Sequence, residues 1–121
     1  MGKKELKNID CLFCKIIKKE VPADIVYEDQ NFVAFNDINP KAPLHILIVP
    51  KKHICSVDYL EDQEKELIGE LFLTAKKIAK EQGVSSKDGK GYRLVFNVGK
   101  EGGQIIEHLH LHLLGKWNNS K

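Results

Sequence analysis

The sequence predicts an α+β protein, with about five mostly antiparallel strands in a meander, one short N-terminal helix and one long helix. Three observations predict this fold class. Apolar and polar residues alternate in the stretch Gly102–Gly115, which is typical of a half-buried strand. The run His45–Val49 is densely apolar, as in a strand buried on both faces. Apolar residues recur at three- and four-residue steps within Glu61–Gln82, which predicts the long helix.

The composition favours one compact domain in the cytoplasm. The chain has 121 residues and is 42% hydrophobic, enough for a core. Its net charge of +2 is mild and its lysines are spread out, so no nucleic-acid partner is expected. We also expect no membrane span and no signal peptide. Three cysteines, an odd number, fit a reducing compartment better than a disulfide scaffold.

The chain is expected to divide into a flexible N-terminus (1–10), one domain (11–117) and a short tail (118–121). The domain begins with the short helix, for which Asp10 is a plausible N-cap. The dipeptide Val21-Pro22 is expected to end this helix.

The remaining elements follow from local patterns. Turn residues between two apolar runs predict a hairpin. The long helix can be capped by Ser56 or Asp58, and Gly83 suits its end. Its apolar stripe is interpreted as core packing. The expected strands are Ile25–Tyr27, Phe32–Phe35, His45–Val49, Tyr92–Val98 and the histidine stretch near the C-terminus.

Three histidines at two-residue spacing stand out. On a strand, His108, His110 and His112 share one face and the intervening leucines share the other. A rise of about 3.3 Å per residue puts neighbouring histidines about 6.6 Å apart and the outer pair about 13 Å apart. One metal ion can hardly bind all three, so the row must serve at least two roles. The alternatives are a generic metal-binding run or a solvated edge strand, but the apolar partner face and Gly102-Gly103 favour a site.

The pair Cys11-x-x-Cys14 can place two thiolates on one cation, as in half of a structural zinc site. A redox dithiol and two small core residues are the alternatives. The strand-then-long-helix context of a thioredoxin-like motif is absent. Cys55 is either a rival ligand or a small buried thiol.

Several spaced motifs together resemble the histidine triad (HIT) superfamily, and within it the Hint branch of purine nucleoside phosphoramidases. The resemblance runs from about Cys11 to Gly115. The motifs are His108-Leu-His110-Leu-His112-Leu-Leu, Asn97-Val-Gly-x-x-Gly-Gly103-Gln104, Phe35-x-Asp37-Ile38-x-Pro40-x-Ala-Pro43-x-His45 and Pro50-Lys-Lys-His53.

The resemblance implies one structural zinc ion per chain, as in the zinc-carrying members of the family. Its ligands would be Cys11, Cys14, His53 and His108. Four protein ligands leave no open coordination position, so no Lewis-acid role is expected. His110 and His112 are then free for other chemistry.

The resemblance also implies an enzyme that acts as a homodimer on purine nucleoside 5′-phosphoramidates or related nucleotidyl conjugates. His110 would attack the α-phosphorus and form a covalent nucleotidyl-histidine, which water then hydrolyses. His112 and His45 would hold phosphate oxygens and orient the nucleophile. Without the resemblance, His45 would equally be a hydrogen-bonded structural residue.

The nucleotide contacts are likewise implied by correspondence. Asp37 would accept the ribose hydroxyls. Gly103, with its preceding glycine, would let backbone N–H groups approach phosphate. Asn97 could donate to a phosphate oxygen or hold the opposite loop. An apolar slot for the base would be made by Phe13, Ile16, Phe35 and Ile38, which the residues alone would assign to the core.

Two departures bear on function. Some relatives carry a serine where this chain has Ile105, which cannot protonate a leaving group. The Hint branch has a longer tail whose tryptophan can reach the partner's site, whereas here Trp117 comes only two residues after Gly115. The resemblance therefore does not extend to selection of substrates by the tail. The alternatives are therefore a dinucleoside polyphosphate hydrolase, or a nucleotide-binding interaction module with little turnover.

Overall fold

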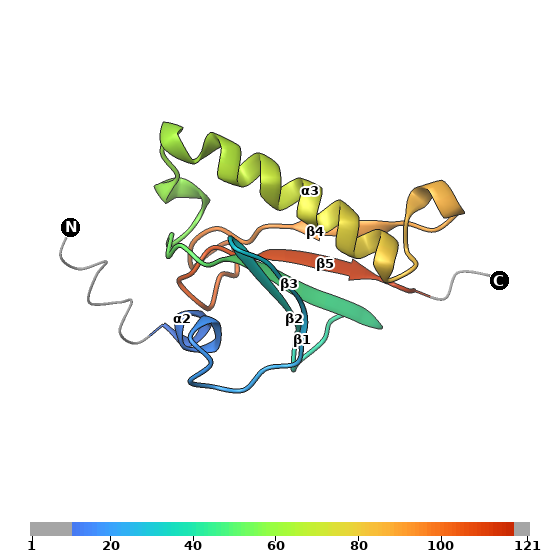
Figure 1. Cartoon of the computed structure of the whole chain (residues 1–121), viewed down its shortest axis with the longest axis horizontal. Coiled ribbons are helices and arrows are strands. Elements are labelled where there is room, and N and C mark those ends of the chain that lie inside the picture. The colour runs from blue at the N-terminus through green and yellow to red at the C-terminus, as the bar shows by residue number, and fades with distance from the viewer. Residues whose placement is uncertain (1–10, 118–121) are drawn as a thin grey trace.

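The computed structural model describes residues 11–117, which form a five-stranded sheet in the order β1-β2-β3-β5-β4 with two helices packed on it (Figure 1). The expected N-terminal segment 1–10 and tail 118–121, and with them the Asp10 cap, lie outside the described residues. The elements are α2 (Leu12–Ile17), β1 (Ile25–Glu28), β2 (Phe32–Asn36), β3 (Leu44–Pro50), α3 (Lys65–Glu81), β4 (Tyr92–Val95) and β5 (Leu111–Gly115).

The predicted fold class is confirmed, and every neighbouring pair of strands is antiparallel. The simple meander holds only for the first three strands. Strand β5 inserts between β3 and β4, so that β4 lies at the edge of the sheet. The chain reaches β4 from β3 by way of α3, which crosses one face of the sheet.

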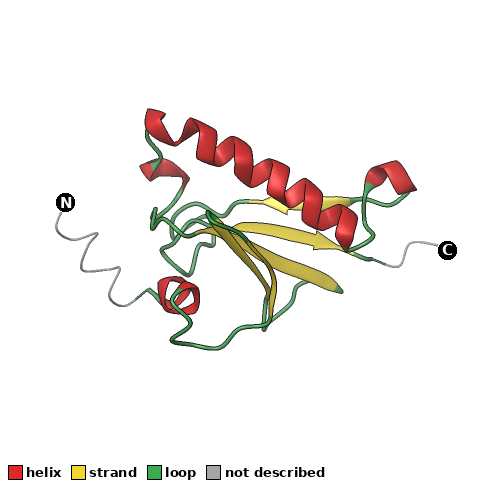
Figure 2. Ribbon diagram, viewed as in Figure 1, coloured by secondary structure: helices red, strands yellow, loops and turns green. Residues whose placement is uncertain are grey.

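The two faces of the sheet carry separate apolar clusters, because side chains alternate along each strand. Figure 2 shows the long helix over one face of the sheet and the short N-terminal helix on the other side. The α3 face contains the larger cluster, including Leu71, Ile78 and the leucines of the histidine row. The α2 face contains a smaller one, including Phe13, Phe35 and the two cysteines of the Cys-x-x-Cys pair. The histidine row therefore has its leucines on the α3 side of the sheet.

Helix α2 starts and ends differently from the sequence prediction. Its N-cap is Cys11, whose thiol accepts a hydrogen bond from the backbone N–H of Cys14 at 3.3 Å. The helix ends at Ile17, ahead of Val21-Pro22. Lys19 adopts a left-handed conformation with φ of 66°, which a continuing α-helix does not allow. The helix therefore ends upstream of Pro22, and the proline is not what terminates it.

Helix α3 begins at Lys65, later than predicted, because two short 3₁₀ turns precede it. Ser56 caps the first of these turns and not α3. Glu61 and Glu64 form a reciprocal capping box on the second. The predicted end is confirmed: Gly83, with φ of 79°, donates its N–H to a carbonyl of the last turn.

Two strands are shorter than their sequence patterns suggest. Strand β4 stops at Val95, whereas the prediction ran to Val98. Strand β5 begins only at Leu111, so His108 and His110 lie in the segment that leads into it. Within residues 11–117, no helix is both long and apolar enough to cross a membrane.

Candidate functional site

The histidine row is divided between two clusters, as its spacing predicted. His108 belongs to a group of four possible metal ligands, and His112 belongs to a separate group with Asp37 and His45. His110 lies between them, with its ring in edge contact with the rings of Phe13 and His112. All three histidines lie on the α2 side of the sheet, since His112 pairs with Leu47 of the smaller cluster and Phe13 of α2 packs against the other two.

Cys11, Cys14, His53 and His108 converge, with one potential ligand atom from each within 4.8 Å of all the others. The Nδ1 atom of His108 lies 3.3 Å from the Cys11 sulfur and 3.1 Å from Nδ1 of His53. The N-cap and the first turn of α2 supply the two thiols, Cys11 and Cys14. Two thiols and two imidazoles arranged in this way suit a tetrahedral cation.

The surroundings of this cluster fit a bound metal ion. The Nε2–H of His108 donates to the carbonyl of Pro50 at 2.8 Å, which leaves the Nδ1 lone pair directed at the cysteines. Burial and the neighbouring Cys11 raise the pKa of the Cys14 thiol to about 12, so this thiol stays protonated unless a cation displaces its proton. Burial also lowers the pKa of His108 to about 4, which keeps it in the neutral, ligating form.

Cys55 lies outside this ligand group. Its sulfur is 3.8 Å from Nε2 of His53, whereas Nδ1 of the same ring faces Cys14 at 3.3 Å. Cys55 thus contacts the far side of a ligand ring. This position favours the small buried thiol over the rival ligand.

The second cluster forms a directed chain of hydrogen bonds. The backbone N–H of Lys41 donates to Nδ1 of His45 at 3.0 Å, so the proton of the neutral His45 ring is on Nε2. That Nε2–H lies 2.9 Å from Nδ1 of His112 and 3.5 Å from a carboxylate oxygen of Asp37. Nδ1 of His112 accepts this hydrogen bond, so the neutral His112 ring must carry its own proton on Nε2.

The same directions argue against a metal ion on Asp37, His45 and His112. A cation bound at Nε2 of His45 would require a proton on Nδ1. That proton would face the Lys41 N–H, donor against donor. The second cluster is thus better described as a hydrogen-bond chain than as a metal site.

The hydrogen-bond chain ends at Nε2 of His112, which is buried and has no partner within the described residues. Among the buried side-chain nitrogen and oxygen atoms of the described residues, Nε2 of His112 alone has no hydrogen-bond partner. Leaving a buried donor unpaired costs about 1–3 kcal/mol. A site that tolerates this cost is well suited to a ligand that brings an acceptor oxygen.

His110 carries the complementary group. Its Nδ1 lies 2.6 Å from the carbonyl of His108, which can only accept, so Nδ1 carries the proton and Nε2 has a free lone pair. Burial lowers the pKa of His110 below the ordinary imidazole value, although the hydrogen bond to the His108 carbonyl and the charge of Asp37 oppose the shift. Burial likewise lowers the pKa of His112 to about 4, and His110 and His45 add to this shift. At neutral pH both rings are uncharged.

The four apolar residues assigned to a base slot are divided by the structure. Phe13, Ile16 and Phe35 are buried in the smaller core cluster, where the rings of Phe13 and Phe35 meet edge to face. Ile38 is 89% exposed. Core packing, the assignment from residues alone, therefore describes three of the four, and their contact with a base stays a prediction.

The glycine-rich segment 97–104 after β4, here called the glycine loop, is held together by hydrogen bonds between its own residues. Asn97 donates its side-chain amide to the carbonyl of Gly102 at 2.9 Å, which matches the loop-holding alternative. Gly103 has φ of 90°, a conformation that favours glycine. A Cβ on Gly102 would lie 2.2 Å from the carbonyl oxygen of Val98, so only glycine fits there. Ile105, just beyond, is 88% exposed.

Three contributors to the site were missed from the sequence: the Lys41 N–H, the Pro50 carbonyl and the side chain of Gln104. The first two are backbone groups, which leave no signature in side-chain patterns. Gln104 follows the glycine pair, and that position was the available signal.

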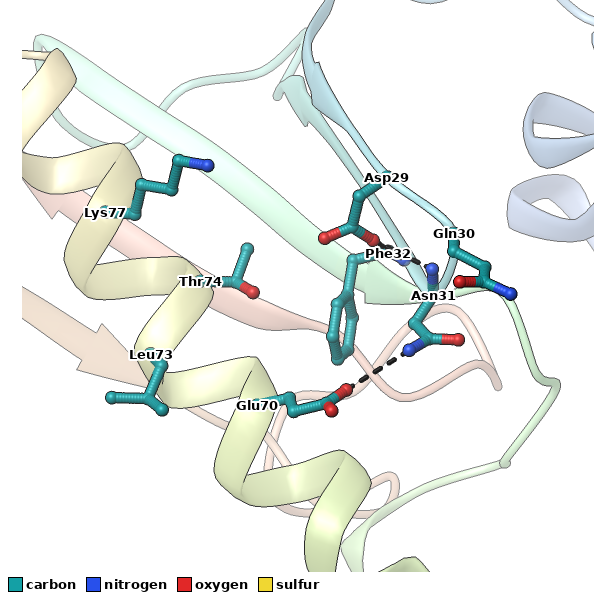
Figure 3. A pocket seen from close by; sticks show the side chains of 8 residues that line it. All are labelled: Asp29, Gln30, Asn31, Phe32, Glu70, Leu73, Thr74 and Lys77. Carbon is teal, nitrogen blue, oxygen red and sulfur yellow. Dashed lines mark hydrogen bonds between the residues drawn. The ribbon is translucent and has the colours of Figure 1, made fainter.

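A groove of about 410 Å³ lies away from the histidines, between the β1–β2 turn and α3 (Figure 3). Asn31 and Glu70 are hydrogen-bonded across it at 3.1 Å. It is lined by mixed charges, including Asp29 and Lys77, and by none of the predicted site residues. We assign no function to it.

The fold and site together define a class of protein in which a row of histidines links a buried Cys₂His₂ cluster to a histidine hydrogen-bond chain. Comparisons with known proteins agree. A family model described as "Scavenger mRNA decapping enzyme C-term binding" matches residues 10–121. An uncharacterized HIT-like protein of Synechococcus elongatus is 48% identical over 106 residues, 88% of this chain and 90% of that protein. The chain belongs to the histidine triad (HIT) family.

Solved structures support the same assignment. A HIT family hydrolase from Legionella pneumophila is 51% identical, covers 89% of this chain and 94% of its own, and superposes with a TM-score of 0.84. A zinc-bound histidine triad family protein from Mycobacterium smegmatis is 28% identical, with a TM-score of 0.75 over 94% of this chain and 80% of its own.

Proposed function

We propose that this protein is a hydrolase of purine nucleoside 5′-phosphoramidates or related nucleotidyl conjugates. The observation that carries the proposal is the pairing of a free lone pair on His110 Nε2 with an unpartnered N–H on His112 Nε2. The two rings are in contact, with centroids 4.9 Å apart. A nucleophile and a hydrogen-bond donor side by side are what attack on a phosphorus atom requires.

In the proposed reaction, Nε2 of His110 attacks the α-phosphorus, and the bond from phosphorus to the amine breaks. The amine leaves with the bonding electron pair and takes a proton from solvent, because the aliphatic side chain of Ile105 has no acidic proton to donate. Water then attacks the nucleotidyl-histidine, the P–N bond to His110 breaks, and the mononucleotide departs. His112 donates to a phosphate oxygen throughout, and His45 fixes the tautomer of His112. Asp37 and Ile38 are proposed to contact the nucleoside.

We also propose that the ion held by Cys11, Cys14, His53 and His108 is zinc, one per chain. The donor set supports this, as does the zinc-bound relative. The ion would hold α2 against the segment that carries the nucleophile. Because such thiols must stay reduced to bind, the proposal includes a cytoplasmic location.

A nucleotide-binding module with little turnover is the second candidate, and the exposed, non-donating Ile105 favours it. Steady-state assay with an adenosine 5′-phosphoramidate and with a dinucleoside polyphosphate separates the candidates. The proposal expects amine and AMP to be released from the first substrate in equal amounts. Binding of AMP without turnover of either substrate would instead identify the module.

The pH dependence of kcat/KM should show an acid limb with its midpoint below 6.5, the ordinary value for histidine. The lone pair of His110 is present above the pKa of its ring and lost as pH falls through it. Since burial lowers that pKa, activity should persist at pH values where an exposed imidazole is mostly protonated.

The control for this profile is stability. The buried histidines have lower pKa values in the folded state than in the unfolded chain. As pH falls through this window, the unfolded chain therefore binds more protons than the folded protein, and the free energy of unfolding also falls. Circular dichroism at each pH excludes unfolding as the cause of the limb. A midpoint at or above 6.5 in folded protein would contradict the assignment of a buried, neutral nucleophile.

A homodimer is proposed on the face formed by α3 and the edge strand β4. Phe72 and Leu73 of α3 are 41% and 65% exposed, and the ring of Phe72 contacts that of Phe96 just after β4. Phe72 lies beside the outer edge of β4, and Leu73 extends the exposed apolar surface of α3 toward the β1–β2 turn. Exposed apolar residues next to a strand edge support a protein interface. Leu73→Glu should shift the sedimentation mass from dimer to monomer. Leu12→Glu, at an exposed leucine of α2 on the opposite face, should leave the dimer intact; a monomeric wild-type protein would contradict the proposal.

A further inference from the structure

The ring of His110 is held by one hydrogen bond and by contacts with two other rings. Its Nδ1–H donates to the carbonyl of His108 at 2.6 Å, which fixes the tautomer. The ring of Phe13 meets it edge to face, with centroids 5.1 Å apart and planes at 88°, and the ring of His112 lies at 4.9 Å. The outer side-chain torsion of a histidine is soft, so a hydrogen bond at Nδ1 does not by itself set the direction of Nε2. The two ring contacts must set it.

Phe13 is itself firmly packed. Its side chain is buried in the smaller core cluster, and its ring meets that of Phe35 edge to face at 5.4 Å. The same ring also contacts the ring of His108, with centroids 5.9 Å apart and planes at 68°. One buried side chain therefore touches both a metal-ligand candidate and the nucleophile.

Helix α2 carries Phe13 between the two cysteines of the four-residue cluster. Cys11 is the N-cap of this helix and Cys14 lies in its first turn. The helix has only six residues, and so short a helix is not stable on its own. Its position depends on the contacts that hold it to the rest of the protein. A cation bound by both thiols would fix the turn of chain from which the Phe13 ring projects.

We propose that Phe13 is a positioning residue for His110, and that zinc aligns the nucleophile through it. The inference rests on the proposed function, because it needs Nε2 of His110 to attack phosphorus. It differs from a contact between Phe13 and the base, which would act on substrate binding, since alignment of the nucleophile acts on the chemical step. A displacement of about 1 Å in the reacting groups can slow such a step by about 10²-fold.

The first test is Phe13→Leu in the zinc-loaded protein, assayed at steady state with an adenosine 5′-phosphoramidate. Leucine remains apolar but lacks the planar edge that meets the His110 ring. We expect kcat to fall by about 10²-fold while KM changes little and zinc stays near one per chain. An unchanged kcat, with or without a higher KM, would overturn the inference, because the ring would then contact at most the base.

Val33→Ala is the matched control for loosened packing. Val33 is fully buried in the same cluster, on β2, and belongs to neither the metal-ligand group nor the histidine hydrogen-bond chain. Its truncation should lower the free energy of unfolding and leave kcat unchanged. An equal loss of kcat in both variants would show a general effect of the core and would overturn the positioning role of Phe13.

The role of zinc is tested in wild-type protein by nuclear Overhauser effects between the ring protons of Phe13 and the carbon-bound ring protons of His110. Removing zinc with a chelator should weaken these signals. Those between Phe72 and Phe96, whose rings meet on the α3 face at 6.2 Å, should remain and report that the sheet is folded. Signals between Phe13 and His110 that zinc removal leaves unchanged would overturn the link to the metal.

Failure of the inference can be told apart from failure of the proposed function. Wild-type protein that does not turn over the phosphoramidate would remove both. Normal turnover by wild-type protein and by Phe13→Leu alike would remove the inference alone and leave His110 as the nucleophile.

Discussion

Replacing His110 should abolish turnover of a nucleoside phosphoramidate. We expect kcat to fall by at least about 10⁴-fold in both His110→Ala and His110→Asn, because no other described group offers an unprotonated nitrogen at this position. Steady-state release of the amine measures the effect. The two variants differ usefully, since the asparagine amide can still donate to the carbonyl of His108 in place of Nδ1–H.

Comparing the two variants distinguishes loss of the nucleophilic Nε2 of His110 from loss of its hydrogen bond to the His108 carbonyl. If the loss came from a displaced backbone, the asparagine variant would retain much more activity than the alanine variant. Metal content and AMP affinity serve as controls for folding and should be largely preserved in His110→Asn. Turnover that survived both substitutions would remove His110 from the mechanism.

Replacing the cysteine pair should have the second large effect, on stability. Cys11→Ser with Cys14→Ser removes half of the ligand set on the α2 face of the sheet. A bound ion present at about 100 to 1,000 times its Kd stabilises the folded state by about 3–4 kcal/mol. For a chain of this size, its loss should lower the melting temperature by about 10 °C or more, measured by calorimetry. Metal analysis should fall from one zinc per chain to none.

Cys55→Ser is the matched control for this experiment. It also replaces a buried thiol, but the sulfur of Cys55 faces the far nitrogen of His53 and not the cluster. Zinc should therefore stay near one per chain. Chelation of the wild-type protein should reproduce the instability of the double variant and have no effect on that variant. Zinc retained after loss of both cysteines would refute the ligand assignment.

Much of this architecture could be predicted from local patterns. The alternation of His and Leu predicted which side chains share a face, because an extended chain has a period of two. The prediction holds although His108 and His110 precede β5, since Leu109 packs with Leu111 and Leu113 in the larger cluster. The apolar stripe of α3 and Gly83 at its end followed from helix geometry in the same way. The division of the histidine row followed from distance alone, since one ion cannot span about 13 Å.

Other features depend on contacts between distant segments and were not predictable. The insertion of β5 between β3 and β4 depends on which strand edges meet in space. The short β5 reflects the Leu109 N–H bonding to Ile54, outside any strand. The capping of α2 by Cys11 joins a helix terminus to the metal cluster, so one residue serves local and distant structure at once.

The proton positions that support the mechanism also needed the structure. The resemblance to the HIT family implied that His45, His110 and His112 act together, but not which ring nitrogen carries each proton. Those positions follow from the Lys41 N–H and the His108 carbonyl, which are backbone groups brought close by folding. The unpartnered Nε2–H of His112 is a consequence of this chain of donors and acceptors.

The central claim is that His108 binds the metal ion while His110, two residues on, bonds covalently to phosphorus. Rapid quenching of the zinc-loaded protein with an adenosine phosphoramidate, followed by peptide mapping at alkaline pH where phosphohistidine survives, tests it most directly. We predict an adenylyl group on His110 alone, in protein that retains one zinc per chain. An adenylyl group on His112 or His45, or zinc displaced as the adduct forms, would contradict it.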